Sequence, residues 1–486
     1  MDVSESGLLR TFSTLDKDDN GRVWAWELLS TLGQAGIQPT DPRVRAALAD
    51  VRDPEGRQIR IDIQPVEIDF RQYAGIAQHG DGVVYRALAG ELAVAPDEFQ
   101  EYASSVEAMY GDLLANRDGK VADYIPTLRD ADPERFGIAI CTADGQTFSI
   151  GDADLGFSVQ STSKPFSYAM ALEQLGPTEV HQWVGQEQSG GTFNDYRLSL
   201  GEGRRPHNPM INAGAMATLA LVDHGQETSD RFRTVRETWT RMMGQAPGFD
   251  QETYLAEKAT GDGNRGLASL MKAADMLKAS GEDGAAKTAD FYFQVCSLEV
   301  DAQRLAAAGA TLANGGIAPY SGERVFSPET AGRVLSVMGH SGMYNDSGKF
   351  SDQVGLPAKS GVSGNVMMVV PSKRLAVVVF SPRLDAAGNS VRGVEVCKRL
   401  VNEFGLHPYR GLGAERSRAV AARSGQQLAG ALNEADRRAE AASAVDRALG
   451  GLSRPGTGGA GTAQTTDTER AGAAATRRTG QQTQQL

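Results

Sequence analysis

A serine that precedes a lysine by three positions stands where a strand-like stretch meets an apolar helical pattern. The segment is Ser161-Thr162-Ser163-Lys164, which follows the stretch over 156–160. At this spacing the serine and lysine side chains can face one side of a helical turn, where the lysine amine can accept the hydroxyl proton. Backbone N–H groups at the helix N-terminus would stabilise a developing oxyanion. Taken alone, the pattern also fits a helix-capping serine beside a solvated lysine.

A second motif strengthens the catalytic interpretation. Lys359-Ser360-Gly361 falls just before the closing strand, where serine acylases of the penicillin-recognising type carry Lys-Thr/Ser-Gly. The edge of that strand can offer a backbone N–H as the second donor to an oxyanion. Both motifs would border the same sheet, so together they predict an acyl-transferring serine enzyme.

Four strand-like runs would hold these motifs in place. Two of them, over 136–141 and 146–150, flank an Asp-Gly pair at 144–145, which is a strong hairpin signal. The other two, over 366–370 and 375–380, form a second hairpin after a mostly helical middle. We expect both hairpins to join one antiparallel sheet. The predicted fold class is therefore α+β, with a helical subdomain inserted between the hairpins.

The composition limits the kinds of partner. The chain of 486 residues has a net charge of −12 and no long basic run, so nucleic acid is not expected as a partner. Its three cysteines lie far apart, which is typical of a reducing compartment and not of a disulfide framework. The sequence shows no signal peptide and no apolar run near the ~20 residues that span a membrane. We therefore expect a cytoplasmic protein without membrane contacts.

Composition also divides the chain into three parts. We expect a helical domain over 1–105, a catalytic domain over 106–409 and a tail over 410–486. The tail begins with an Ala/Arg-rich stretch that can form one exposed helix. It ends in Gly, Thr and Gln residues, a composition typical of disorder.

A loop near the N-terminus fits the pattern of a calcium-binding EF-hand. Side-chain oxygens fall at loop positions 1, 3 and 5, which are Asp16, Asp18 and Asn20. Position 7, which supplies a backbone carbonyl, is Arg22, and position 12 is Glu27, whose two oxygens can bind together. Helical patterns flank the loop on both sides. The first domain is therefore predicted to be all-α and EF-hand-like, with Ca²⁺ as its expected ligand.

An alternative stays open for the loop over 16–27. Such loops usually work in pairs, and the region over 50–73 lacks the ligand spacing of a second one. A lone loop would keep the helix–turn–helix shape and bind calcium weakly.

Further motifs give the chain a family resemblance. From about 106 to 409 it resembles the serine-dependent glutaminases, which are related in fold to β-lactamases and penicillin-binding proteins. The matching segments, in family order, are 123–126, 160–165, 193–194, 206–215, 257–262, 290–294, 311–316, 342–344 and 356–362.

The resemblance implies a set of catalytic roles. Ser161 would attack the side-chain amide of glutamine, and Lys164 would accept its proton. Tyr344 would lie beside this pair as a proton relay, and Tyr292 would lie close to the serine. The backbone N–H groups of Ser161 and Val362 would form the oxyanion hole. No metal or organic cofactor is implied for catalysis.

The resemblance also implies a substrate pocket for L-glutamine. A carboxylate is needed for the α-ammonium group, and neutral donors suit the α-carboxylate. Half-buried aromatic side chains and helix caps are the alternatives for the tyrosines and asparagines. The implied substrate-binding residues are Tyr124, Gln160, Ser161, Asn212, Glu257, Asn264, Tyr292, Tyr344 and Val362.

Members of this family commonly form homodimers or homotetramers, so the resemblance predicts a homo-oligomer. Two other functions remain as alternatives. A penicillin-binding acylase or β-lactamase is expected to be secreted with a signal peptide, which this sequence does not show. A calcium-responsive interaction protein with an inactive acylase domain would not depend on Ser161.

Overall fold

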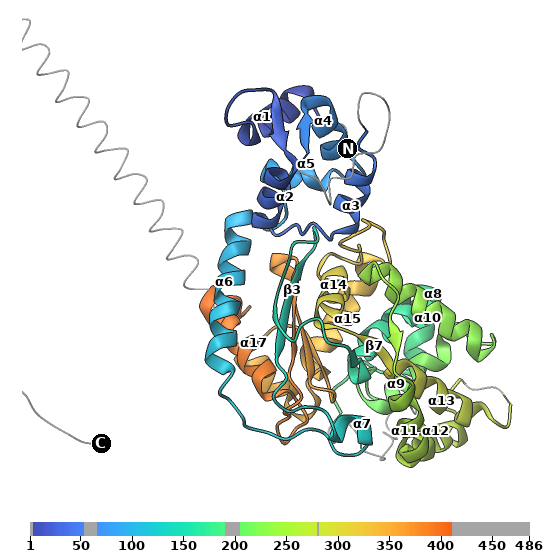
Figure 1. Ribbon diagram of the computed structural model, residues 1–486. Coiled ribbons are helices and arrows are strands. Elements are labelled where there is room, and N and C mark those ends of the chain that lie inside the picture. The colour runs from blue at the N-terminus through green and yellow to red at the C-terminus, as the bar shows by residue number, and fades with distance from the viewer. Residues whose placement is uncertain (1–2, 53–65, 190–204, 279–280, 411–486) are drawn as a thin grey trace, which may run out of the picture. The chain divides into compact units, whose positions relative to one another are not determined.

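The catalytic part is built on one five-stranded antiparallel sheet. The computed structural model describes residues 3–52, 66–189, 205–278 and 281–410 (Figure 1). The strand order is β4-β3-β10-β9-β8, so the two predicted hairpins lie side by side in one sheet, as expected. The strands are β3 (Gly137–Thr142), β4 (Thr147–Gly151), β8 (Ala358–Gly361), β9 (Asn365–Val370) and β10 (Leu375–Phe380).

Both faces of the sheet are buried at β3, β9 and β10, which explains why these strands are continuous apolar runs in the sequence. Ala139 and Val378 belong to the core under helix α14 (Ala302–Ala313). Their neighbours in the sequence, such as Ile138 and Val377, belong to the core under α6 and α17. Figure 1 shows these two helices on one side of the sheet and α14 on the other. They span Pro96–Leu113 and Val391–Phe404.

The inserted subdomain between β4 and β8 is mainly helical, as predicted. The sequence did not reveal a second, three-stranded sheet in this region, with the order β5-β7-β6. It matters for the site because β5 leads directly to Ser161. The elements of the insertion, besides α14, are β5 (Phe157–Ser158), α8 (Lys164–Trp183), α9 (Asn212–Leu221), α10 (Thr228–Met243), β6 (Gly248–Phe249), α11 (Gln251–Thr260), α12 (Asp262–Ala273), α13 (Gly284–Cys296), β7 (Leu298–Val300), α15 (Pro328–Ser341) and α16 (Ser347–Gln353).

The Lys-Ser-Gly motif lies just before the closing hairpin, as predicted. The structure adds that Lys359, Ser360 and Gly361 themselves form most of β8, the edge strand of the sheet. A tight turn then leads from β8 into β9. The motif is therefore part of an edge strand beside the site.

The prediction of an all-α first domain is wrong in one respect. Two three-residue strands, β1 (Arg22–Trp24) and β2 (Glu67–Asp69), pair antiparallel, with Val23 opposite Ile68. Strands this short leave no periodic signal in a sequence. The remaining elements are helices: α1 (Glu5–Leu15), α2 (Ala25–Gln34), α3 (Pro42–Ala49), α4 (Phe70–Gln78) and α5 (Val83–Leu88).

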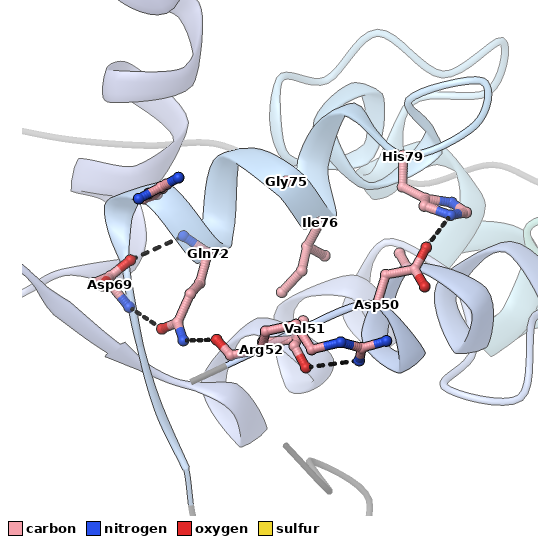
Figure 2. Close-up of a pocket in the computed structure, with 10 residues that line it drawn as sticks. Asp50, Val51, Arg52, Asp69, Gln72, Gly75, Ile76 and His79 are labelled. Atoms are coloured by element: carbon pink, nitrogen blue, oxygen red, sulfur yellow. Dashed lines mark hydrogen bonds and ion pairs between the residues drawn. The ribbon is translucent and has the colours of Figure 1, made fainter. Parts of the chain in front are cut away.

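A reciprocal cap follows β2, and one of its two hydrogen bonds has a counterpart after β1. The backbone N–H of Asp69 donates to the side chain of Gln72, and the backbone N–H of Gln72 donates to Asp69 (Figure 2). At the equivalent place after β1, the N–H of Trp24 donates to Glu27. Gln72 follows Ile68 by four positions, just as Glu27 follows Val23. The two halves of the domain are therefore built alike around the β1–β2 pair.

A cavity of about 560 Å³ lies between α3 and α4 in this domain (Figure 2). On its walls, Gln72 donates to the carbonyl of Arg52, and His79 pairs with Asp50 at 3.2 Å. None of the predicted catalytic residues lines it.

The first domain is bonded to the β3–β4 hairpin. Asp144, in the hairpin turn, accepts hydrogen bonds from the side chain of Arg86 and from the backbone N–H of Ala93. Its backbone carbonyl accepts from Arg43 at 2.7 Å. Gly145 follows with a φ of +82°, a left-handed conformation that glycine adopts without strain. The Asp-Gly pair thus makes the predicted turn and also anchors the first domain.

The domain boundaries stay predictions. Helix α6 runs through the boundary expected at 105/106, so that segment is continuous helix. The expected helix and disordered end of the tail lie outside the described residues, apart from residue 410. Within the part of the chain that the structure describes, no helix is long and apolar enough to cross a membrane.

Candidate active site

Ser161 lies in a single 3₁₀ turn that links β5 to α8. The turn spans Gln160–Ser163, and its first residue has a φ of +45°, which is unusual for a residue with a side chain. The hydroxyl of Ser163 donates to the carbonyl of Gln160 at 2.7 Å, so it serves the turn itself. Ser161 instead lines an open cavity. The structure therefore favours Ser161 over Ser163 as the nucleophile.

Lys164 is not the solvated lysine of the alternative interpretation. Its side chain is buried, with a relative exposure of 1%. The Nζ atom donates to Oδ1 of Asn212 at 2.7 Å. Burial disfavours the charged amine and lowers the pKa of Lys164 from 10.5 to about 8. A substantial neutral fraction near pH 8 is what a general base requires.

Tyr344 lies beside the nucleophile. Its phenol is in hydrogen-bonding interaction with Ser161, and burial raises its pKa, so it is a phenol and not a phenolate. The backbone of Tyr344 is left-handed, with a φ of +50°. Such a conformation costs free energy and persists only where the surroundings enforce it.

The lysine of the Lys-Ser-Gly motif supports this tyrosine. Nζ of Lys359 lies 4.5 Å from the ring centroid of Tyr344 and donates to the carbonyls of Gly342 and Ser360 at 3.0 and 2.8 Å. The side chain is fully buried, which holds the pKa of Lys359 well below its usual value. The sequence marked this motif, but only the fold reveals its contact with Tyr344.

The carboxylate of Glu257 accepts hydrogen bonds from two other predicted substrate-binding residues. Oε1 of Glu257 accepts from the hydroxyl of Tyr124 at 2.8 Å and from Nε2 of Gln160 at 3.2 Å. Burial raises the pKa of Glu257, while these two hydrogen bonds act in the opposite direction. The three residues come from far apart in the chain, and the fold brings them together as predicted.

A second group forms around Asn212. Its Oδ1 accepts from Lys164 and, at 3.2 Å, from the hydroxyl of Tyr292. Its Nδ2 donates to Oδ1 of Asn264 at 3.1 Å. Asn212 begins helix α9, but these bonds reach other side chains, so it does not act as the simple helix cap of the alternative interpretation.

A cavity of about 440 Å³ connects the two groups. It contains every residue that was predicted to bind substrate except Tyr344, which lies beside Ser161. Its lining residues are Tyr124, Gln160, Ser161, Asn212, Glu257, Thr260, Gly261, Gly263, Asn264, Leu267, Tyr292, Cys296 and Val362.

Sequence reasoning missed Cys296 in this cavity. The thiol interacts with Tyr292 and Ser163, and burial raises its pKa to about 12. It is therefore a neutral thiol that packs beside the site and not a second nucleophile. Its spacing of four residues from Tyr292 on α13 was the available signal, because such residues share one helix face.

The family model described as Glutaminase matches residues 119–409. The chain belongs to the glutaminase family. The recognition made from the motifs is thus confirmed, and the chain is a glutaminase enzyme and hence a hydrolase. The α+β fold class is confirmed as well, whereas the EF-hand-like interpretation of the first domain stays a prediction.

Glutaminases of very different organisms are similar to this chain. It is 36% identical over 409 residues to Putative glutaminase 3 of Caenorhabditis elegans, a match that covers 82% of this chain and 68% of the relative. It is 42% identical over 328 residues to a Glutaminase of Microcystis aeruginosa, with 68% and 94% covered. Of the mouse protein named Glutaminase liver isoform, mitochondrial, it covers 67% at 35% identity. The chain spans only 63% of Putative glutaminase 2 of Caenorhabditis elegans.

Solved structures agree with this family. The structure described as Mglu in its native form is 42% identical, with a TM-score of 0.60, and the match covers 64% of this chain and 73% of that one. A structure described as Mglu in its glutamate form is 41% identical, with a TM-score of 0.59 and coverage of 64% and 69%.

Proposed function

We propose that this glutaminase hydrolyses L-glutamine to L-glutamate and ammonia through an acyl-enzyme on Ser161. The carrying observation is the buried Lys164, whose pKa is lowered to about 8, three residues from a serine that lines a polar cavity. Family membership supports the reaction. One of the similar structures is described as a glutamate form, and glutamate is the product of the proposed reaction.

The proposed first half-reaction is acylation. Neutral Lys164 takes the proton of the Ser161 hydroxyl, whose oxygen attacks the side-chain amide carbon of glutamine. The backbone N–H groups of Ser161 and Val362 hold the tetrahedral oxyanion. The proton then passes to the leaving nitrogen, with the phenol of Tyr344 as the relay. The C–N bond breaks, ammonia leaves, and a glutamyl ester remains on Ser161.

The second half-reaction releases the product. A water molecule gives up a proton to Lys164 and attacks the ester carbonyl, and the same oxyanion donors hold the new intermediate. The ester C–O bond breaks, Ser161 regains its proton, and glutamate leaves. The chain's own residues therefore supply every proton transfer in the cycle.

The polar groups of the cavity suit the two ends of glutamine. We assign the α-ammonium to Oε2 of Glu257, because both hydrogen bonds from Tyr124 and Gln160 reach the other oxygen. We assign the α-carboxylate to the neutral donors Asn264 and Tyr292, which line the same cavity; the Tyr292 hydroxyl would turn from Oδ1 of Asn212 toward the substrate.

Ammonia and glutamate release by the purified chain tests the reaction. We expect stoichiometric release of both products from L-glutamine and no turnover of a chromogenic β-lactam. The reverse result would assign the chain to the penicillin-type acylases. Release of neither product would leave the inactive interaction protein as the better interpretation.

We also propose that Ca²⁺ binds at the loop over 16–27. The carboxylate of Asp16 accepts from the backbone N–H groups of Asn20 and Gly21, so the loop already bends around it. The carboxylate of Glu27 accepts a hydrogen bond from the backbone N–H of Trp24 and would have to turn toward the ion. In the described residues, no group of three or more His, Cys, Asp or Glu side chains has a geometry ready for a metal. Binding would therefore reorganise the loop, and a low affinity is expected.

Calcium titration of the full chain checks this proposal. Trp24 and Trp26 are exposed within the loop, so their fluorescence reports its conformation. We expect a saturable change with a dissociation constant of about 10⁻⁵ to 10⁻³ M, and its loss in Asp16→Ala. Asp50→Ala removes an exposed carboxylate outside the loop and should titrate like the wild type. Identical curves for Asp16→Ala and the wild type would refute the site.

The homodimer or homotetramer and the cytoplasmic location stay predictions. The mouse relative carries a mitochondrial designation in its name, which applies to that protein.

A further inference from the structure

The proposed oxyanion hole joins two distant parts of the chain. One N–H belongs to Ser161, just after β5, and the other belongs to Val362, in the turn between β8 and β9. Gly364 closes this turn by donating to the carbonyl of Gly361 at 3.0 Å, and its φ of +99° is a glycine conformation. Both N–H groups must lie about 2.7–3.1 Å from one oxygen atom. The distance between this turn and β5 must therefore stay constant if both N–H groups are to reach the same oxygen.

A buried pair of side chains spans this gap. The hydroxyl of Ser363 donates to the carbonyl of Ser158 at 2.7 Å, although the two residues are 205 positions apart. Nδ2 of Asn365 donates to the Ser363 hydroxyl at 3.0 Å and approaches the same carbonyl at 3.4 Å. Ser158 ends β5 and precedes Ser161 by three residues. The Val362 turn is thus bonded to the segment that carries the nucleophile.

Two further observations show that the turn packs tightly against the segment after β5 and that Asn365 pays a free-energy penalty there. A Cβ atom at Gly361 would lie 3.0 Å from the carbonyl of Val159 and 2.1 Å from Oδ1 of Asn365, so only glycine fits there. That Oδ1 is buried and has no hydrogen-bond partner in the described part of the chain. Leaving a buried acceptor unsatisfied destabilises the folded state. An apolar residue would avoid this cost, so the benefit of Asn365 lies in its Nδ2.

We propose that Ser363 and Asn365 are positioning residues that set the distance between the two oxyanion donors. Neither side chain lines the substrate cavity, so each acts through Val362 and Ser161. The inference rests on the proposed acyl-enzyme mechanism and deepens it. Without the hydrogen bonds from Ser363 and Asn365 to the Ser158 carbonyl, the turn can move away from β5. This movement weakens transition-state binding more than substrate binding.

Steady-state kinetics of Ser363→Ala in the full chain tests the proposal. We expect kcat to fall about 10- to 100-fold, because a displacement near 1 Å can cost that much, while KM changes by less than about threefold. The midpoint of the pH profile should not move, since Lys164 is untouched. Asn365→Ala should act in the same direction, and Ser363→Thr, which keeps the hydroxyl, should restore most of kcat.

A matched control separates positioning from stability. Thr142 carries the buried hydroxyl of the other hairpin turn, where it accepts from Gln146. Thr142→Val should lower the melting temperature yet leave kcat unchanged. If Ser363→Ala and Asn365→Ala keep kcat within about threefold of wild type, the two side chains have no positioning role. The same conclusion follows if these variants lose activity only as they unfold. A wild type that releases no ammonia would refute the proposed function instead, so the two failures can be told apart.

Discussion

Replacing Ser161 with alanine will abolish ammonia release from glutamine, with a loss in kcat of at least about 10⁴-fold. The mutation removes the oxygen that forms the ester, and no other hydroxyl in the described cavity has both the position and the base. Burial of the site is preserved, because alanine differs only by one oxygen atom. A coupled assay of ammonia release measures the effect.

Ser163→Ala is the matched control for this variant. Its hydroxyl lies two residues away but donates to the carbonyl of Gln160 inside the turn. We expect it to keep activity within about tenfold of wild type, since one neutral hydrogen bond contributes only about 1 kcal/mol. The opposite pattern, with Ser161→Ala active and Ser163→Ala inactive, would move the nucleophile to Ser163.

The rate will depend on pH through Lys164. The base must be neutral, and burial lowers its pKa to about 8, so kcat/KM should rise about tenfold per pH unit below pH 8 and level off above it. At pH 7 only about one molecule in ten carries the neutral amine. The plateau above pH 8 depends on the lowered pKa of Lys164. With the usual lysine pKa of 10.5, kcat/KM would keep rising throughout the neutral range and show no plateau there.

Two substitutions at this position check the assignment. Lys164→Met fills the buried space with an apolar chain, and Lys164→Arg keeps a charge that cannot be removed near neutral pH. Both should lose at least about 10³-fold in kcat at every pH, while circular dichroism shows a folded chain. A pH midpoint that survives in either variant would assign the titration to another group, such as the neighbouring Lys359.

Local signals were sufficient for the two hairpins of the large sheet. The Asp-Gly pair at 144–145 predicts its hairpin because it favours a tight turn, and the structure has β3 and β4 on either side. The apolar runs of β9 and β10 were recognised as a hairpin although both faces are buried, since the break over 371–374 separates them. The three-residue strands β1 and β2 were not recognisable, because each is defined by a pairing partner far away in the chain.

The site was predicted by a different route. Each motif taken alone left an ordinary structural explanation open for residues such as Tyr124 and Glu257. Only the combined resemblance to the family implied that they bind substrate. The structure adds the contacts that the pattern cannot express. The 2.8 Å bond between these two side chains links residues 133 positions apart, a relation that no spacing rule covers.

The family, the order of the hairpins and the serine–lysine pair three residues apart could all be inferred from the amino-acid sequence. Those properties depend on local patterns or on the joint match of many motifs, so no three-dimensional information is needed to find them. The structure was needed to show that the Ser163 hydroxyl bonds within its own turn, that Lys164 and Lys359 are buried, and that Ser363 bonds to Ser158 across the site. Burial and long-range hydrogen bonds depend on what the rest of the chain places around a residue. For that reason the reactivity of Ser161-Thr162-Ser163-Lys164 follows from the fold and not from the four residues alone.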